Sequence, residues 1–145
     1  MSLVSLLNLL LQIAGLAMIL LSLAHFYLAR LLDWKSDLGK LKPINQQVFF
    51  AHTVFLTIGM TMLGFVCIFY SHELTNKSTL AAISALCFAM CWLSRLIFQF
   101  VVFTSAFVED SRLEKILRLA GTLLWLFLTV LFGLLFAYQV GLVGN

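Results

Sequence analysis

The stretch that decides the fold runs from Val4 to Ala29 and reads VSLLNLLLQIAGLAMILLSLAHFYLA. It contains no Asp, Glu, Lys or Arg, and it is longer than the roughly 20 residues that a helix needs to cross about 30 Å of hydrocarbon. Comparable apolar runs follow at 48–70, 80–103 and 119–140. Because the runs lack the alternating polarity of membrane barrel strands, they predict transmembrane helices.

The composition excludes an ordinary soluble domain. Of the 145 residues, 63% are apolar and only 10% are charged, whereas globular proteins carry about a quarter charged residues. Short links favour antiparallel neighbours, so we predict one all-α transmembrane domain over 1–145, an antiparallel four-transmembrane-helix bundle. The first run lacks the basic region and cleavage pattern of a signal peptide and is expected to be retained as a helix.

The positive charges predict the orientation of the chain. Seven of the nine Lys and Arg residues lie in the links that follow the first and third runs, and the other two are Lys77 and Arg95. Cytoplasmic loops are rich in Lys and Arg, so these links are expected in the cytoplasm and both termini on the non-cytoplasmic side. Because these cations flank membrane spans and alternate with carboxylates, no nucleic-acid partner is expected.

A short amphipathic helix is predicted in the first link. Four apolar residues recur there at about helical spacing among charged residues: Leu31, Trp34, Leu38 and Leu41. This pattern is typical of a helix that lies in the membrane interface, with Trp34 as an anchor. In the third link, Ser111 and Glu114 match a capping box that would start the fourth helix.

The polar residues inside the runs predict a ligand-binding site. His25 shortly precedes the first link and His52 shortly follows it, which puts both roughly 7 Å inside the cytoplasmic face. Gln99 is expected at a similar level, with Arg95 deeper in the membrane. We therefore expect His25, His52, Arg95 and Gln99 to converge on one polar pocket in the cytoplasmic half of the bundle.

Arg95 is the most costly of these residues, because a charge at the centre of a span costs about 2.5–3.5 kcal/mol even on insertion scales. No Asp or Glu lies in any of the four runs. Arg95 either reaches the headgroups, or pairs with Glu109 or Asp110, or binds an anion such as a lipid phosphate or a haem propionate. We expect it to point into the bundle and to contact Gln99, His52, a loop carboxylate or a bound anion.

The two histidines leave open whether the chain binds a cofactor. Imidazoles from two helices at one depth could ligate a b-type haem, but they could equally form hydrogen bonds between helices. A metal site of the zinc type is not expected, since it needs three or four ligands and the runs supply no carboxylate. No serine, cysteine or threonine has the neighbours of an activated nucleophile.

Small and polar residues at helical spacing predict close packing between helices. The stripes are Asn8, Gly15 and Ser22 in the first run, Thr57, Thr61 and Gly64 in the second, and Ser84, Cys87 and Cys91 in the third. Asn8, Gln12, Tyr138 and Gln139 are expected to form hydrogen bonds between helices, or to anchor the chain at the interface, in the other half of the membrane.

Two stretches, LKPINQQVFFAH at 41–52 and WLSRLIFQ at 92–99, resemble small uncharacterised four-helix integral membrane proteins of bacteria, and no characterised family. The resemblance implies a multi-pass protein of the bacterial inner membrane, in which the neighbourhoods of His52 and Arg95 belong together. It implies no activity and no cofactor.

Several functions remain open at this point. The leading expectation is a polar intramembrane pocket that binds an amphiphilic or anionic ligand, or an accessory subunit of a larger membrane complex. The expected partners are membrane lipids and either other membrane subunits or further copies of the chain. The rivals are a membrane enzyme acting on a lipid or quinone through His25 or His52, and an electron-transfer subunit that carries haem b.

The charge distribution predicts a measurable topology. A cysteine introduced at Ser36 should react with a membrane-impermeant thiol reagent only from the cytoplasmic side, and one introduced in the 71–79 link only from the opposite side. Reaction of the two positions from the reversed sides would show that the orientation is wrong.

Overall fold

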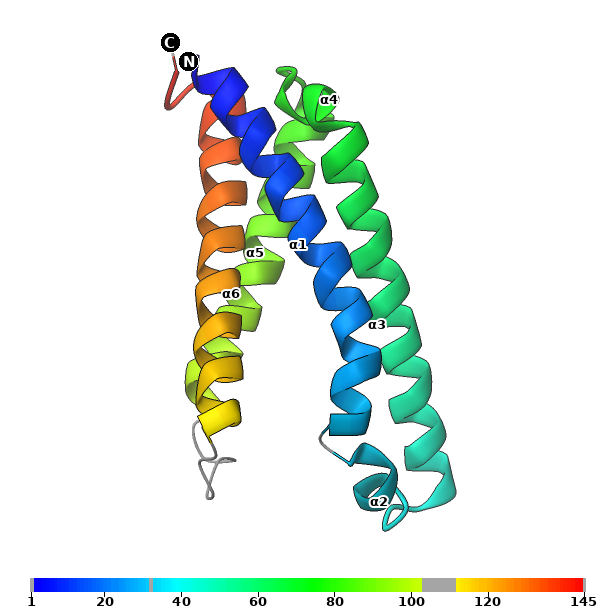
Figure 1. Ribbon diagram of the computed structural model, residues 1–145. Helices are drawn as coiled ribbons and strands as arrows, with labels where there is room; N and C mark the ends of the chain where they lie inside the picture. The colour runs from blue at the N-terminus through cyan, green and yellow to red at the C-terminus, as the bar shows by residue number, and fades with distance from the viewer. Residues whose placement is uncertain (1, 32, 103–111, 145) are drawn as a thin grey trace. The chain divides into compact units, whose positions relative to one another are not determined.

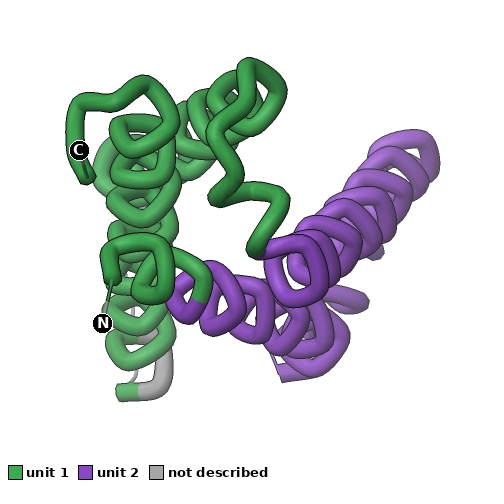
Figure 2. The backbone as a smooth tube through the Cα atoms, turned by 90° about the horizontal axis from the view of Figure 1, so that it is seen from above, with its two compact units in different colours: residues 1–8, 72–145 green, residues 9–71 purple. Residues whose placement is uncertain are grey.

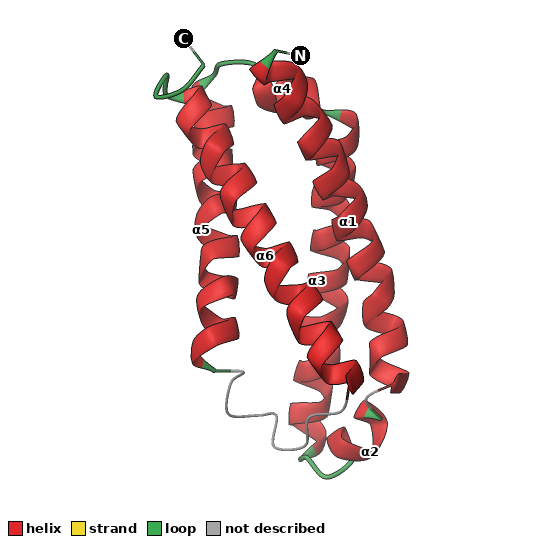
Figure 3. Ribbon diagram, turned by 60° about the vertical axis from the view of Figure 1, so that its left-hand side comes forward, coloured by secondary structure: helices red, strands yellow, loops and turns green. Residues whose placement is uncertain are grey.

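The computed structural model describes residues 2–31, 33–102 and 112–144, and every regular element in these ranges is a helix (Figure 1, Figure 3). The helices are α1 (Leu3–Leu31), α2 (Trp34–Leu38), α3 (Pro43–Phe69), α4 (Ser71–Thr75), α5 (Thr79–Val101) and α6 (Arg112–Gln139). The predicted all-α class is therefore confirmed. The predicted capping box depends on Ser111, which lies outside the described residues, as do Glu109 and Asp110.

Four helices are long and apolar enough to cross a membrane: Leu3–Leu31, Pro43–Phe69, Thr79–Val101 and Lys115–Gln139. They coincide with the four apolar runs of the sequence. Large apolar side chains such as Leu20, Phe55 and Leu123 are more than half exposed. Exposed apolar surface on this scale is unfavourable in water, so the chain is a multi-pass membrane protein.

The chain divides into two compact units, which Figure 2 colours separately. One unit contains residues 1–8 and 72–145, and therefore the start of α1, most of α4, and all of α5 and α6. The other contains residues 9–71, which form the rest of α1, α2 and α3. We call them the α5–α6 unit and the α1–α3 unit.

In the α1–α3 unit, α1 and α3 run antiparallel (Figure 1), and they meet at two glycines. A Cβ atom added to Gly15 would lie 2.5 Å from the Gly64 carbonyl oxygen, and one added to Gly64 would lie 2.8 Å from the Gly15 carbonyl oxygen. The two backbones therefore touch. Two turns after Gly15 in α1, the Ser22 hydroxyl donates to the Thr57 carbonyl of α3 at 2.9 Å and lies 2.7 Å from the Thr61 hydroxyl. The predicted close-packing faces of these two helices are confirmed.

The turn between α1 and α2 contains a residue in the left-handed conformation. Asp33 has φ 45° and ψ 43°, a region that Asp adopts more readily than most residues. The five-residue helix α2 follows, with Trp34 and Leu38 half-buried and Lys35, Ser36 and Asp37 exposed. The predicted short amphipathic helix is therefore present.

In the α5–α6 unit, α5 and α6 form an antiparallel pair (Figure 1). Hydrogen bonds from side chains hold the end of the pair where α5 begins and α6 ends. The Gln139 amide donates to the carbonyls of Leu74 (2.6 Å) and Asn76 (3.1 Å) and accepts from the Ser78 backbone at 3.1 Å. The Ser78 hydroxyl in turn caps α5 by accepting from Ala81 N–H. These bonds satisfy backbone groups that the turn would otherwise leave unpaired.

The first turns of α1 join this unit through Asn8. Its carbonyl oxygen accepts from the Thr75 hydroxyl at 3.0 Å, so its amide nitrogen is left to donate to His72 Nδ1 at 3.2 Å. In the other unit, the Gln12 amide donates to the Ser71 hydroxyl at 3.5 Å. The predicted hydrogen bonds between helices are confirmed for Asn8, Gln12 and Gln139.

The contact between Gly15 and Gly64 predicts a selective loss of stability. Gly15→Ala should destabilise the protein by about 1–3 kcal/mol, because the added methyl group forces two backbones apart. Gly59→Ala is the matched control, since a Cβ atom at Gly59 meets nothing within 4 Å. Thermal unfolding in detergent measures both, and equal midpoints for the two variants would contradict the proposed backbone contact.

Candidate ligand-binding site

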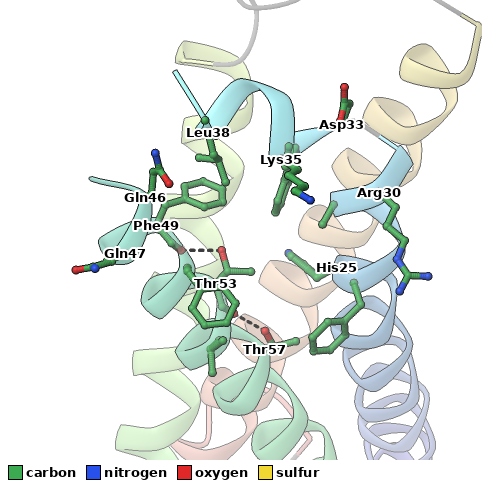
Figure 4. A pocket seen from close by; sticks show the side chains of 16 residues that line it. His25, Arg30, Asp33, Lys35, Leu38, Gln46, Gln47, Phe49, Thr53 and Thr57 are labelled. Carbon is green, nitrogen blue, oxygen red and sulfur yellow. Dashed lines mark hydrogen bonds between the residues drawn. The ribbon is translucent and has the colours of Figure 1, made fainter. Parts of the chain in front are cut away.

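A cavity of about 900 Å³ lies within the α1–α3 unit, between α1 and α3 and against α2 (Figure 4). Its walls are mostly apolar, with Phe26, Ala29, Trp34, Phe49, Phe50 and Val54 among the lining residues. The cavity continues along α3 as far as Thr57, about 21 Å from the start of that helix at Pro43. Its volume lies within the 300–1,000 Å³ of typical small-molecule sites.

The hydroxyls on the α3 wall are satisfied by their own helix. Thr53 donates to the Phe49 carbonyl at 2.9 Å, and Thr57 donates to the Thr53 carbonyl. In such bonds the hydroxyl proton is already donated to the helix backbone and is not available to a ligand. The α3 side of the cavity therefore offers apolar surface and hydroxyl oxygen lone pairs, with no free donor from these two residues.

His25 supplies a polar group from α1. Its Nδ1 lies 2.8 Å from the Leu21 carbonyl oxygen, and because a carbonyl only accepts, Nδ1 must carry the proton. This fixes Nε2 as the ring atom that is free to meet a ligand. The ring points from α1 into the cavity (Figure 4).

The helix α2 closes one end of the cavity. Trp34 packs edge-on against Phe49 of α3, with ring centroids 5.2 Å apart, and this contact holds α2 over the opening. The side chain of Lys35 extends into the same region as the His25 ring, whereas Gln46 and Gln47 point outward (Figure 4). Arg30 and Asp33 also line this end, but their charged groups turn away from the His25 ring (Figure 4). Lys35 is therefore the charged side chain that shares this end of the largely apolar cavity with the imidazole.

The neighbouring lysine is engaged elsewhere. Lys40 forms an ion pair with Asp37 at 2.8 Å, on a fully exposed part of the surface that does not line the cavity. The hydrogen bond to Asp37 raises the pKa of the Lys40 amine. Asp37 therefore does not neutralise Lys35 at the cavity.

The two predicted histidines do not share this cavity. His52 is exposed on α3 and is absent from the lining residues, and no hydrogen bond joins its ring to His25. The residues next to it, Thr53 and Val54, do line the cavity. The rotation of α3 about its axis turns Thr53 toward the cavity and leaves His52 outside it.

Arg95 and Gln99 lie in the α5–α6 unit and contact each other, which is one of the contacts expected for Arg95. Arg95 Nη1 donates to Gln99 Oε1 at 3.1 Å, and the guanidinium carbon lies 4.9 Å from the centroid of the Trp125 ring. Gln99 and Trp125 are buried. Since His25 and His52 belong to the other unit, convergence of all four residues on one pocket stays a prediction.

Some residues of the cavity were not predicted from the sequence. Lys35 and Trp34 were assigned to the interface, and Thr53 was not singled out. One feature of the sequence does indicate the cavity wall. Trp34 and Leu38 lie at positions i and i+4, on one apolar face of a short helix, and such a face packs against other apolar residues.

Comparisons with models of protein families, with curated proteins and with solved structures find no match to this chain. Among the described residues, no group of three or more His, Cys, Asp and Glu side chains could hold a metal ion. The assignment of function therefore rests on the geometry of the cavity.

Proposed function

We propose that this chain is a lipid-binding membrane protein that holds an amphiphile with an anionic head in the cavity beneath α2. The observation that carries the proposal is the cavity of about 900 Å³, apolar over most of its wall, with Lys35 and His25 at one end. Few polar groups in a largely apolar pocket are typical of sites that fix the head of an apolar ligand.

The polar end selects the head of the ligand. The Lys35 amine attracts an anionic oxygen, and His25 Nε2 accepts a hydrogen bond from a hydroxyl. A phosphate monoester offers both an anionic oxygen and a hydroxyl. The apolar tail would then lie along α3, against Phe50, Val54 and Thr57.

Binding is favoured over catalysis because the hydroxyls that face His25 are engaged: Thr53 and Thr57 both donate to carbonyls of their own helix. The Leu21 carbonyl fixes the tautomer of His25, as it would in a binding site or in a catalytic one. The proposal therefore includes a ligand-carrying or accessory role in a larger membrane complex. The same residue is also where a lipid- or quinone-directed enzyme would place its acid-base group.

The haem alternative requires a second imidazole. A bis-histidine site needs two rings that face one iron atom, and His52 does not line the cavity that His25 enters. This cavity therefore does not support a haem b ligated by His25 and His52.

We propose that the α2 end of the chain faces the cytoplasm of a bacterial inner membrane. The support is the concentration of Lys and Arg at 30–42 and 112–118, against the single Lys77 in the 71–79 link. An anionic lipid head at the cytoplasmic surface would then be within reach of Lys35.

The cavity predicts a selective binding defect. Native mass spectrometry of the full chain in detergent should detect one bound lysophosphatidate at lower concentration than the uncharged monoacylglycerol of equal chain length. Lys35→Gln should weaken lysophosphatidate binding about tenfold, the value of one hydrogen bond to a charged group, and leave monoacylglycerol binding unchanged. Ala29→Phe should weaken both, because Ala29 lines the cavity and a phenyl ring fills part of it.

Lys40→Gln is the matched control, since it removes the same charge from the same link at a position outside the cavity. The proposal fails if Lys40→Gln and Lys35→Gln weaken binding equally, or if Ala29→Phe binds both amphiphiles as the unaltered chain does.

A further inference from the structure

A second hollow lies next to the first in the α1–α3 unit. It is a groove of about 250 Å³, lined by residues of α1 between Ser22 and Phe26 and by residues of α3 between Thr57 and Phe65. Phe26 and Thr57 also line the cavity beneath α2, so the two hollows meet at these side chains. The groove therefore continues the cavity along α3.

The hydroxyl groups of the groove are all engaged within the protein. The Ser22 hydroxyl donates to the Thr57 carbonyl at 2.9 Å, and the Thr61 hydroxyl donates to the same carbonyl at 2.8 Å. The Thr57 hydroxyl donates to the Thr53 carbonyl. These three residues therefore offer a ligand no hydroxyl proton, and the other lining residues are apolar. The part of a ligand that lies in the groove must be apolar too.

The groove is open along its side. Leu23, Ile58 and Met62 line it and are 61%, 50% and 64% exposed, so a hydrocarbon chain can enter from the bilayer. A chain that does so exchanges contacts with lipid tails for contacts with the protein, and the hydrophobic effect does not drive that exchange. Specific occupation of the groove therefore requires that the head of the same ligand is held elsewhere.

The two hollows together are longer than one leaflet of a bilayer. From Phe49, which contacts Trp34 of α2, to Met62 in the groove, α3 rises about 20 Å. Half of a hydrocarbon core of about 30 Å is about 15 Å. Thr57, where the hollows meet, is near the middle of α3 (Pro43–Phe69). A chain that fills both hollows must therefore reach beyond the middle of the span.

We infer that the groove holds the far end of the tail of the amphiphile bound beneath α2, and that this ligand is an anionic amphiphile with a chain longer than one leaflet. The inference rests on the proposed function, because Lys35 and His25 must hold the head for the tail to follow α3 past Thr57. A shorter chain ends within the cavity and leaves the groove to bilayer lipids.

Probes with a diazirine at the end of the tail test this path, because the carbene formed on irradiation inserts into a bond of the nearest residue. The full chain in lipid nanodiscs is irradiated with a lysophosphatidate probe that carries either an octanoyl or a stearoyl chain, and labelled residues are identified by peptide mass spectrometry. The octanoyl probe should label Phe50 and Val54 in the cavity. The stearoyl probe should label Met62 and Phe65 in the groove.

Bilayer lipids also touch an open groove, so the labelling must depend on the head. A stearoyl monoacylglycerol with the same diazirine should label Met62 no more than Leu56, a residue of α3 that is 49% exposed and lines neither hollow. Lys35→Gln should lower labelling of Met62 by the stearoyl lysophosphatidate about tenfold below saturation. Labelling of Met62 that is equal for both stearoyl probes, or unchanged by Lys35→Gln, would overturn the inference.

A matched pair of tryptophan variants tests the location. Ile58→Trp fills part of the groove and should abolish labelling of Phe65 by the stearoyl lysophosphatidate, while the octanoyl probe still labels the cavity and thereby shows that the unit is folded. Leu56→Trp makes the same change on the same helix at a similarly exposed position outside the groove, and it should keep both labels. Unchanged labelling of Phe65 in Ile58→Trp and in Leu23→Trp, which obstructs the groove from α1, would contradict the path.

The inference and the proposed function fail in different ways. If the octanoyl lysophosphatidate labels the cavity and the stearoyl one does not label the groove, the amphiphile binds beneath α2 but its tail does not follow α3, and the inference alone is overturned. If neither lysophosphatidate labels its hollow more than the monoacylglycerol does, the proposed function fails as well.

Discussion

Hydrocarbon offers no hydrogen-bond partner, so each polar group along the four spans must find a partner within the protein. A polar group without a partner would destabilise the fold. Most of them do so in the simplest way. Thr53, Thr122 and Thr129 donate to carbonyls one turn back in their own helices. Ser22 instead reaches across to α3, and such bonds between helices fix how neighbours rotate against each other. The arrangement within each unit follows from this requirement, together with backbone contact at the glycines.

Much of the fold could be predicted because depth and helix length are one-dimensional properties. Charges mark the ends of a span, and a fixed rise per residue converts sequence position into depth. The four spans follow from that coordinate, and the short helix α2 follows from the spacing of its apolar residues. Gln99 is one of several contacts that were expected for Arg95. Glycine and hydroxyl residues at seven-residue spacing in α1 also identified the face that meets α3.

Rotation about a helix axis is a second coordinate, and the sequence constrains it poorly when every side of a helix is apolar. The sequence predicts a similar depth for His25 and His52, yet Thr53 lines the cavity and His52 does not. A shift of one residue turns a side chain by about 100°, which is enough to move it from a cavity to the surface. The cavity itself could not be predicted, because it depends on where α2 folds back, and that depends on the left-handed backbone of Asp33.

The helix α2 connects the stability of the α1–α3 unit to the function proposed for it. Five residues are too few for a helix to form by propensity, since isolated helices shorter than about 12 residues are marginal in water. Its order must come from side-chain contacts, chiefly the edge-on packing of Trp34 against Phe49. An amphiphile in the cavity would add apolar contacts to Trp34 and Leu38 and a charged contact to Lys35. A ligand that binds only the ordered form of α2 stabilises that form. Because α2 has little stability of its own, its order should depend on the ligand more than that of α1 or α3 does.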